Sequence, residues 1–488
     1  MKNKLFSILT VVLSAGIMTS CVSFSDEPNI EYIKMEAEPT YAWESEVLGD
    51  DVLPIVTFCS PLEERGSYAN TMTDEVMQLL KDSGINIVMT YSISNGSAQE
   101  KKLADLCEKH GIGIMASTGE SGYWRIDKAQ NTIIGYEEYS AEEQKAVDDA
   151  FRELLQGLTE YKNLVGIRFT DEDGIQSFAS AGAARKVFDE VLGKDKFFSH
   201  NLISQQGSYS MLEYGYSFTK LSNAPISNEL VAGGYNYYLS HELETVGPTA
   251  LSYDLYPFNK MTKVNGVIHE NMRTAYNMAY KYQKPFWNYI QVYGGDGSNP
   301  SELARIPNYN EMEWQVSASL GMGAKGLVLY PYFWPLEQSE DGFQTAFGRD
   351  GKPTQMYYDL KTPLANIASY DHIIMNSTTK SVMIGGIEKN ILQKPSANMI
   401  VESFNELQSV ASHETGVVVY NMNYQGKTAL YVVNASIEEN KVADISLHFS
   451  KKVEASVYQN GEKSVEVAKN LTLKDVPSGR AVMVVLGE

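Results

Sequence analysis

Cysteine is scarce in this chain, with three residues among 488. No Cys/His cluster has the spacing of a zinc site, and we expect neither a metal nor another cofactor. Cys59 and Cys107 fall in a strand-like and a helix-like run, so they are expected to be small buried residues rather than a disulfide. A Gly-rich phosphate turn is also missing after the first strand-like run, which ends in Phe58-Cys59-Ser60-Pro61 and argues against a doubly wound nucleotide-binding sheet.

Positive charge is in short supply as well. Lys and Arg number 40 against 61 Asp and Glu, a net charge of -21. Nucleic-acid binding requires basic patches, so this balance excludes nucleic acid as a partner and disfavours anionic polymers. A neutral ligand fits better. Tyrosine is abundant, at 31 residues, and its ring joins an apolar face to a polar edge, which suits sugars as well as protein cores.

The first residues read as an export signal. Lys2 and Lys4 precede a short apolar run, and Met18-Thr19-Ser20 stand before Cys21. A Cys directly after small residues resembles the lipobox of bacterial lipoproteins, with Met18 in place of the usual Leu. We therefore expect a signal peptide over 1–20, lipidation of Cys21, and a polar tether over 21–49 that anchors the protein to the cell envelope, on the outer membrane, without spanning it.

Strand-like and helix-like runs alternate through residues 50–372. Each strand-like run is short and apolar, and most of the helix-like runs have apolar residues on one face. Eight such alternations over this length predict an α/β fold, a (β/α)₈ TIM barrel. The expected strands are 52–58, 85–91, 112–117, 164–167, 197–203, 250–256, 286–292 and 326–333.

The helical pattern stops after about residue 372. Short β-type runs separated by polar turns follow, at 416–421, 428–434, 443–449, 454–458 and 481–486. This spacing predicts a small C-terminal antiparallel β-sandwich domain over 373–488.

The fourth expected strand ends in three consecutive acids, Asp171, Glu172 and Asp173. Like charges at close range resist ionising together, so such a run is found where carboxylates bind a ligand or take part in chemistry. Catalytic groups of barrel enzymes also sit at the C-terminal ends of the strands. The alternative is a solvated turn rich in Asp.

Three motifs support a resemblance to known barrels. Asp171-Glu172 ends the fourth strand, and Asp254-Leu255-Tyr256-Pro257 ends the sixth, as Asp-x-Tyr-Pro. The third motif is Pro285-Phe286-Trp287, Gln291, Pro307, Glu311-Met312 and Gly323-Ala324-Lys325-Gly326. Together, over about residues 50–370, they resemble the retaining glycoside hydrolases of clan A and the barrels related to bacterial β-galactosidases.

The resemblance implies that Glu172 is the general acid/base, because a glycosidic oxygen leaves only when it is protonated. It also implies a Glu nucleophile at the end of the seventh strand, where this chain has Gln291. Gln291 cannot attack an anomeric carbon and is expected to bind substrate instead. Asp254 is the first candidate for the second carboxylate, with Asp171 and Glu120 as alternatives. Glu311 is expected to start a helix, where the dipole favours an acid.

Aromatic residues recur near the same strand ends and could stack against sugar rings, although each could equally belong to the core. Asn201 and His200 lie near the end of the fifth strand and could bind hydroxyl groups, while a lone His is more often structural. Trp287, in mid-strand, is expected to pack in the core. The aromatic candidates are Trp124, Tyr256, Tyr293, Tyr332 and Trp334.

Two functions fit these patterns. The first is hydrolysis of a glycosidic bond in a neutral oligo- or polysaccharide by a lipid-anchored surface protein, with Glu172 as proton donor. The second is a glycan-binding lipoprotein without catalysis, which Gln291 favours. A structural surface protein without a ligand is a third possibility, which the acids and aromatics at the strand ends disfavour.

Overall fold

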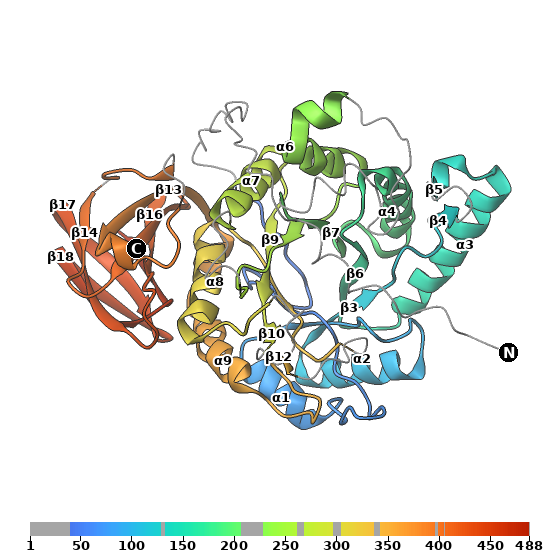
Figure 1. The fold of residues 1–488 in the computed structure, drawn as a ribbon, viewed down its shortest axis with the longest axis horizontal. Helices are drawn as coiled ribbons and strands as arrows, with labels where there is room; N and C mark the ends of the chain where they lie inside the picture. The colour runs from blue at the N-terminus through green and yellow to red at the C-terminus, as the bar shows by residue number, and fades with distance from the viewer. Residues whose placement is uncertain are drawn as a thin grey trace.

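The computed structural model describes residues 40–127, 132–205, 228–260, 268–295, 304–335, 342–395, 399–404 and 406–487. Their centre is a closed barrel of eight parallel strands, which confirms the predicted fold (Figure 1). Around the barrel the order is β1, β11, β9, β8, β7, β6, β3 and β2. The strands are β1 (Ile55–Thr57), β2 (Ile87–Met89), β3 (Gly113–Ser117), β6 (Leu164–Asp171), β7 (Phe197–Ile203), β8 (Leu251–Asp254), β9 (Phe286–Gln291) and β11 (Leu327–Tyr330).

Helices surround this barrel at the positions that the apolar periodicity predicts. Four of the helices begin with a side-chain cap. The side chain of the capping residue accepts a hydrogen bond from the backbone N–H three residues later, and the capping residues are Thr73, Ser97, Ser140 and Asn308. The helices are α1 (Asp74–Asp82), α2 (Ala98–His110), α3 (Ala141–Leu158), α4 (Phe178–Leu192), α6 (Asn228–Thr245), α7 (Ile268–Lys281), α8 (Tyr309–Gly321), α9 (Gln355–Ile367) and α10 (Asp371–Met375).

Two small two-stranded sheets stand outside the barrel order, and the sequence patterns did not predict them. β4 (Trp124–Asp127) pairs with β5 (Thr132–Gly135), and β10 (Tyr293–Gly295) pairs with β12 (Phe343–Thr345). Both extend from the carboxyl ends of barrel strands, so they add walls to the end where a barrel carries its active site.

The C-terminal domain is antiparallel, as expected, with longer strands than the sequence predicts. The runs expected at 443–449 and 454–458 form one strand, β17 (Val442–Gln459), which bends between His448 and Val453. It pairs with β18 (Glu462–Pro477) on both sides of the bend. Its strands are β13 (Ser377–Gly386), β14 (Leu407–Ala411), β15 (Gly416–Tyr424), β16 (Lys427–Asn434), β17 (Val442–Gln459), β18 (Glu462–Pro477) and β19 (Ala481–Leu486).

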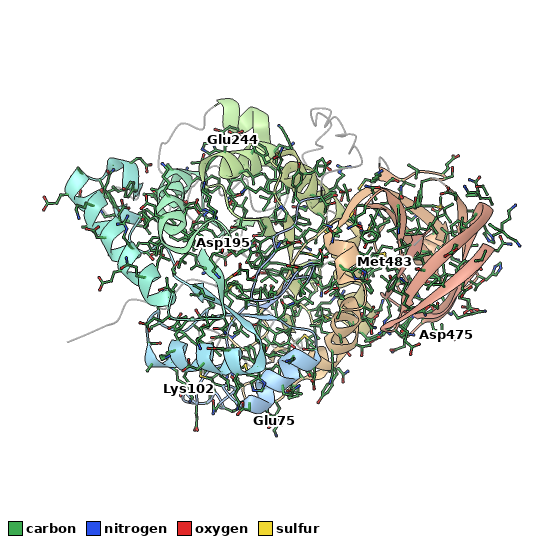
Figure 2. The ribbon with its side chains drawn as sticks, turned by 180° about the vertical axis from the view of Figure 1, so that it is seen from behind. Glu75, Lys102, Asp195, Glu244, Asp475 and Met483 are labelled. Carbon is green, nitrogen blue, oxygen red and sulfur yellow. The ribbon has the colours of Figure 1, made fainter. Side chains whose placement is uncertain are left out.

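The β domain packs directly on α8 and α9 of the barrel, and Met483 lies in this contact (Figures 1 and 2). A side chain at Gly321 in α8 would meet the Tyr420 ring at 2.4 Å, so the glycine allows the close approach. Arg480 forms a buried ion pair with Glu313 across the same contact. The strands of the domain form one seven-stranded sheet with a core of its own, while the core at the contact is continuous with that of the barrel.

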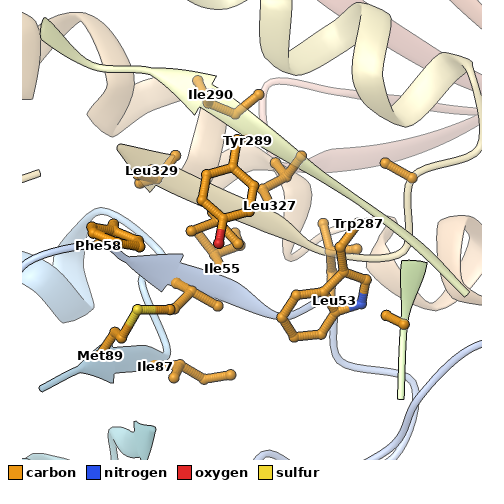
Figure 3. Packing of buried hydrophobic residues seen from close by; sticks show 14 of the residues in the cluster. Leu53, Ile55, Phe58, Ile87, Met89, Trp287, Tyr289, Ile290, Leu327 and Leu329 are labelled. Carbon is orange, nitrogen blue, oxygen red and sulfur yellow. The ribbon is translucent and has the colours of Figure 1, made fainter. Parts of the chain in front are cut away.

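The amino-terminal end of the barrel is closed by aromatic rings. Trp287 stacks on Phe197 with centroids 4.0 Å apart, and Trp43, from the segment before β1, covers both. Figure 3 shows Trp287 beside Leu53 at this end, with Tyr289 one layer further along β9. The expectation that Trp287 packs in the core is confirmed. Access to the barrel is therefore from its carboxyl end. Among the described residues no helix is long and apolar enough to cross a membrane.

Candidate active site

The turn after β6 presents the acids that the sequence singled out. β6 has an irregular register with β7 between Arg168 and Thr170, so Arg168 and Asp171, three residues apart, both face the barrel interior. Glu172 follows with φ 51°, a left-handed conformation that is uncommon for a residue other than Gly. Its backbone N–H donates to the carbonyl of Asn201 at 2.9 Å. Such local strain is typical of functional sites.

Asn201 on β7 connects two of the carboxyl groups. Its Nδ2 donates to Asp171 Oδ1 at 2.9 Å and to Asp254 Oδ1 at 3.3 Å. Ser252 Oγ donates to Asn201 Oδ1 at 2.9 Å, which fixes the orientation of the amide. Because one amide nitrogen holds both acceptors, these two carboxyl oxygens are at most about 6 Å apart, and about 5 Å apart at the usual trigonal angle.

Asp171 is paired with donors on both carboxyl oxygens. Arg168 Nη2 lies 2.9 Å from Asp171 Oδ2, so both carboxylate oxygens have a donor. The guanidinium is itself enclosed, 5.2 Å from the Phe58 ring centroid and 5.1 Å from that of Tyr91. The Asp171 side chain keeps 29% of its surface exposed, which leaves it accessible from the mouth of the barrel.

The side chains of Glu172 and Asp254 lie in contact at this rim. Their carboxyl groups are hydrogen-bonded to each other, and the charge of Asp254, followed by burial and the charge of Asp171, raises the pKa of Glu172 well above its usual range. Burial and the charge of Asp171 raise the pKa of Asp254 to about 7. The hydrogen bond favours the proton on Glu172, with Asp254 as acceptor. The cluster thus combines a carboxylate with a protonated carboxyl group at neutral pH.

Aromatic rings line the barrel mouth around these groups. Tyr256 stacks on Tyr330 at 5.0 Å, and Tyr293 meets both rings edge-on. Phe58 bridges from Tyr330 to Tyr91, with centroids 4.8 and 4.9 Å apart. Tyr256 also bonds Asp254. The wall therefore offers ring faces and hydroxyl groups next to the carboxyl cluster.

The structure brings some of the predicted site residues together and separates others. Asp171, Glu172, Asp254, Asn201, Tyr256 and Tyr293 meet at the mouth. Three of the aromatic candidates are buried and pack against other rings, so they belong to the core. The pairs are Trp124 with Phe169, Tyr332 with Phe347, and Trp334 with Phe343. Glu120 is exposed in the turn after β3.

Gln291 has a different environment from the substrate contact that the sequence suggested. Its side chain is fully buried and bonds the backbone of Phe258 in both directions, at 2.9 and 3.0 Å, and the carbonyl of Tyr293 at 3.1 Å. All of the amide's polar atoms are thereby engaged in joining the loops after β8 and β9. Glu311 caps the start of α8 and pairs with Arg305, as its position predicted.

Sequence reasoning missed several residues of the site. Arg168 is a charged residue within the apolar part of β6, ahead of the terminal Asp171, which was a usable signal. Tyr289 has its hydroxyl in the barrel interior (Figure 3), with the charges of Asp171 and Arg168 acting on it. His200 was considered as a hydroxyl binder, but it lies behind the turn, bonded to Asp173 and Glu242.

No family model matches this chain, and no curated protein matches it. Solved structures do. It is similar to β-galactosidases from Halorubrum lacusprofundi (11% identity, 64% of this chain and 58% of that one, TM-score 0.42) and Marinomonas ef1 (8%, 68% and 63%, TM-score 0.44). It is also similar to an α-amylase from Geobacillus thermoleovorans (8%, 92% and 100%, TM-score 0.48).

The chain spans about three fifths of the length of those two β-galactosidases. At these identities the likeness concerns architecture alone, so any activity must be argued from the carboxyl cluster. In fold, the chain is a (β/α)₈ barrel followed by an antiparallel β domain.

Proposed function

We propose that this protein hydrolyses a glycosidic bond in a neutral oligo- or polysaccharide. The observation that carries the proposal is the carboxyl cluster, in which Asp171 is ion-paired with Arg168 and Glu172 is hydrogen-bonded to Asp254. Glycoside hydrolysis by two carboxyl groups requires one ionised group and one protonated group at the same pH. The mouth supplies both, a few ångströms apart.

In this proposal Glu172 is the general acid. Its proton passes to the glycosidic oxygen as the bond to the anomeric carbon breaks, and the raised pKa keeps that proton available near neutral pH. Asp254 accepts the Glu172 hydrogen bond and maintains this pKa. It is then too close to Glu172 to stand on the opposite side of a sugar ring, which makes it a poor nucleophile candidate.

Asp171 is accordingly our candidate for the nucleophile. It would form a covalent bond to the anomeric carbon, which water later breaks with Glu172 acting as base. Retaining enzymes have their two carboxyl groups about 5–5.5 Å apart. The bound of about 6 Å between Asp171 and Asp254 oxygens, with Glu172 in contact with Asp254, is compatible with that spacing. We therefore propose net retention of anomeric configuration.

The proposed substrate is uncharged. The acids of the mouth repel anionic sugars, and Arg168 is already neutralised by Asp171. The rings of Tyr256, Tyr293 and Tyr330 can stack on the C–H faces of sugars and bond their hydroxyl groups. We further propose that the protein acts at the cell envelope, anchored through Cys21, which lies outside the described residues.

Trapping the intermediate tests the proposal. Wild-type protein is screened on a panel of aryl glycosides, and the matching 2-deoxy-2-fluoro glycoside is then used to slow hydrolysis of the covalent intermediate. We expect the label on the tryptic peptide that begins at Phe169, with fragmentation placing it on Asp171. Asp171→Asn and Glu172→Gln should each lower the turnover of an unactivated glycoside about 10²–10⁴-fold.

The control is Glu63→Gln, an exposed acid of the β1–α1 loop that pairs with Lys102. It should retain wild-type turnover. A label on Asp254 or Glu172 would exchange the roles proposed here. If calorimetry shows glycan binding by the wild-type protein while no reducing ends form, the protein is a glycan-binding protein and the hydrolase proposal is wrong.

A further inference from the structure

Behind the catalytic turn lies a second group of ionisable side chains, which the proposed chemistry does not use. His200 Nε2 is 3.0 Å from Asp173 Oδ2, and its Nδ1 is 3.0 Å from Glu242 Oε1 on α6. All three side chains are fully buried. Two hydrogen bonds to carboxylates require a hydrogen on each ring nitrogen, which is the imidazolium form.

The protonation of this group is consistent with that geometry. Burial works against the imidazolium, but the hydrogen bonds to Asp173 and Glu242 outweigh it and raise the pKa of His200 to about 9. Burial raises the pKa of Glu242, although the bond to His200 opposes this. The raised pKa of His200 keeps its imidazolium form at neutral pH.

Such a group is costly to bury. Charges removed from water lose several kcal/mol each of solvation, and apolar residues in their place are often neutral or more stable. Asp173 Oδ1 and Glu242 Oε2 are also buried without a partner among the described residues. A purely structural contact between β7 and α6 would not need buried ionisable side chains. We therefore ask which part of the chain this group holds in place.

What it holds is the turn that carries Glu172. Asp173 follows Glu172 directly, accepts a bond from Thr170 through its side chain, and accepts a bond from Tyr238 through its carbonyl at 2.6 Å. On the other side, the Glu172 N–H is bonded to Asn201. The left-handed backbone of Glu172 is strained and persists only where the surroundings enforce it.

The alternation of β7 links the two groups. Successive side chains point to opposite faces of a strand, so Asn201 faces the barrel interior and His200 faces the helices. Asn201 holds Asp171 and Asp254 in front of the turn, while His200 holds Asp173 behind it. Both faces of β7 therefore fix the carboxyl cluster.

We propose that His200 is a positioning residue that joins Asp173 to Glu242 of α6 and thereby holds the turn that directs Glu172 toward Asp254. This inference rests on the proposed function, since it assigns His200 a part in the acid step. His200 touches no reacting atom. Its loss should misplace the acid and leave the Asp171 carboxylate in position, because Asp171 has its own donors in Arg168 and Asn201.

The test compares two leaving groups on the sugar that the wild-type protein cleaves. A dinitrophenyl glycoside needs little protonation, whereas a methyl glycoside depends on the acid. In His200→Gln, kcat/KM for the methyl glycoside should fall about 10²-fold, the size expected when a catalytic group is misplaced by about 1 Å. The dinitrophenyl glycoside should change less than about 3-fold, with KM unchanged. Glu242→Gln, which keeps shape and a hydrogen-bond acceptor, should show the same selectivity at smaller size.

His241→Gln is the matched control, because His241 neighbours Glu242 on α6 but is partly exposed and is hydrogen-bonded to Thr245 of its own helix. It should leave both rates unchanged. Equal losses on both glycosides in His200→Gln, or no loss on either, would overturn the proposal. If His200→Gln does not fold, Glu242→Gln decides in the same way.

A readout without turnover separates this inference from the proposed function. The carbonyl stretch of the protonated Glu172–Asp254 pair is identified as the infrared band that Glu172→Gln removes. In His200→Gln this band should shift and titrate at lower pH, because the pair is no longer held together. An unchanged band in His200→Gln refutes the positioning role, whether or not the wild-type protein cleaves a glycoside. If the band shifts in His200→Gln but the wild-type protein cleaves no glycoside, the positioning role stands and only the hydrolase proposal is wrong.

Discussion

Replacing Asp254 by Asn should make the protein more stable at alkaline pH while it removes the proposed activity. The cause is the raised pKa of Asp254, about 7 in the folded chain against 3.8 as the ordinary value. Asn keeps the shape of the side chain. Its oxygen can still accept from Asn201, and its amide can donate to Glu172, which is then free to ionise without facing a second carboxylate.

The sign and size follow from proton linkage. Below pH 3.8 both folded and unfolded states hold the proton, so Asp254 costs nothing. As pH rises toward 7 the unfolded chain releases the proton and the folded chain keeps it, so stability falls by up to about 4 kcal/mol and stays lower above pH 7. Asn lacks this cost. For a chain of 488 residues the entropy of unfolding is about 1 kcal/mol/K, so the gain at pH 8 is about 4 °C in Tm.

The assay is scanning calorimetry of wild type and Asp254→Asn at pH 4, 6 and 8. The difference in Tm should be near zero at pH 4 and grow with pH. Asp444→Asn, which removes an exposed carboxylate paired with Lys474, should bring no gain at pH 8. A variant that melts at or below wild type at pH 8, or a difference independent of pH, would show that the Glu172–Asp254 pair does not retain its proton in the folded state.

Three further outcomes are expected. Gln291→Ala should lower Tm, because the buried backbone groups of Phe258 and the carbonyl of Tyr293 lose their hydrogen bonds. Each buried group left without a partner costs about 1–3 kcal/mol of stability. A variant with unchanged Tm and weaker glycan binding would instead make Gln291 a ligand contact. Arg480→Met should cost about 3–5 kcal/mol in urea unfolding by leaving Glu313 buried and unpaired, and adding Glu313→Leu should recover part of the loss; an equal or greater loss in the double variant contradicts this account. Cys21→Ala should move the protein from the membrane fraction to the soluble fraction, and wild-type protein without acyl groups by mass spectrometry would refute the anchor.

The barrel could be predicted because its signals are local. Each strand is a short apolar run, and helices such as α1, α2 and α3 have a side-chain cap and an apolar face, so the alternation is visible in the chain. The meeting of Asp171, Glu172, Asn201 and Asp254 followed from the same prediction, since the carboxyl ends of barrel strands share one rim.

The remaining features of the site depend on contacts that the sequence pattern does not contain. In a regular strand Arg168 and Asp171 would point to opposite faces, and only the register shift near Phe169 brings them to the same side. Gln291 occupies the position where the resemblance implied a nucleophile, but its partners come from loops whose course is set by tertiary packing. The aromatic candidates Trp124 and Trp334 could not be told from core residues by type alone, and both are buried.

Because Trp43 closes the amino-terminal end of the barrel, the barrel has one sealed end and one open end. Thr40 and Tyr41 lie beside Lys325 and Phe286 at the starts of β11 and β9, the end opposite to the carboxyl cluster. With the anchor proposed at Cys21, the chain would approach the barrel from the membrane side and reach the sealed end first. The mouth would then face outward, so a long polymer could reach Asp171 and Glu172 from the medium without passing between the protein and the lipid surface.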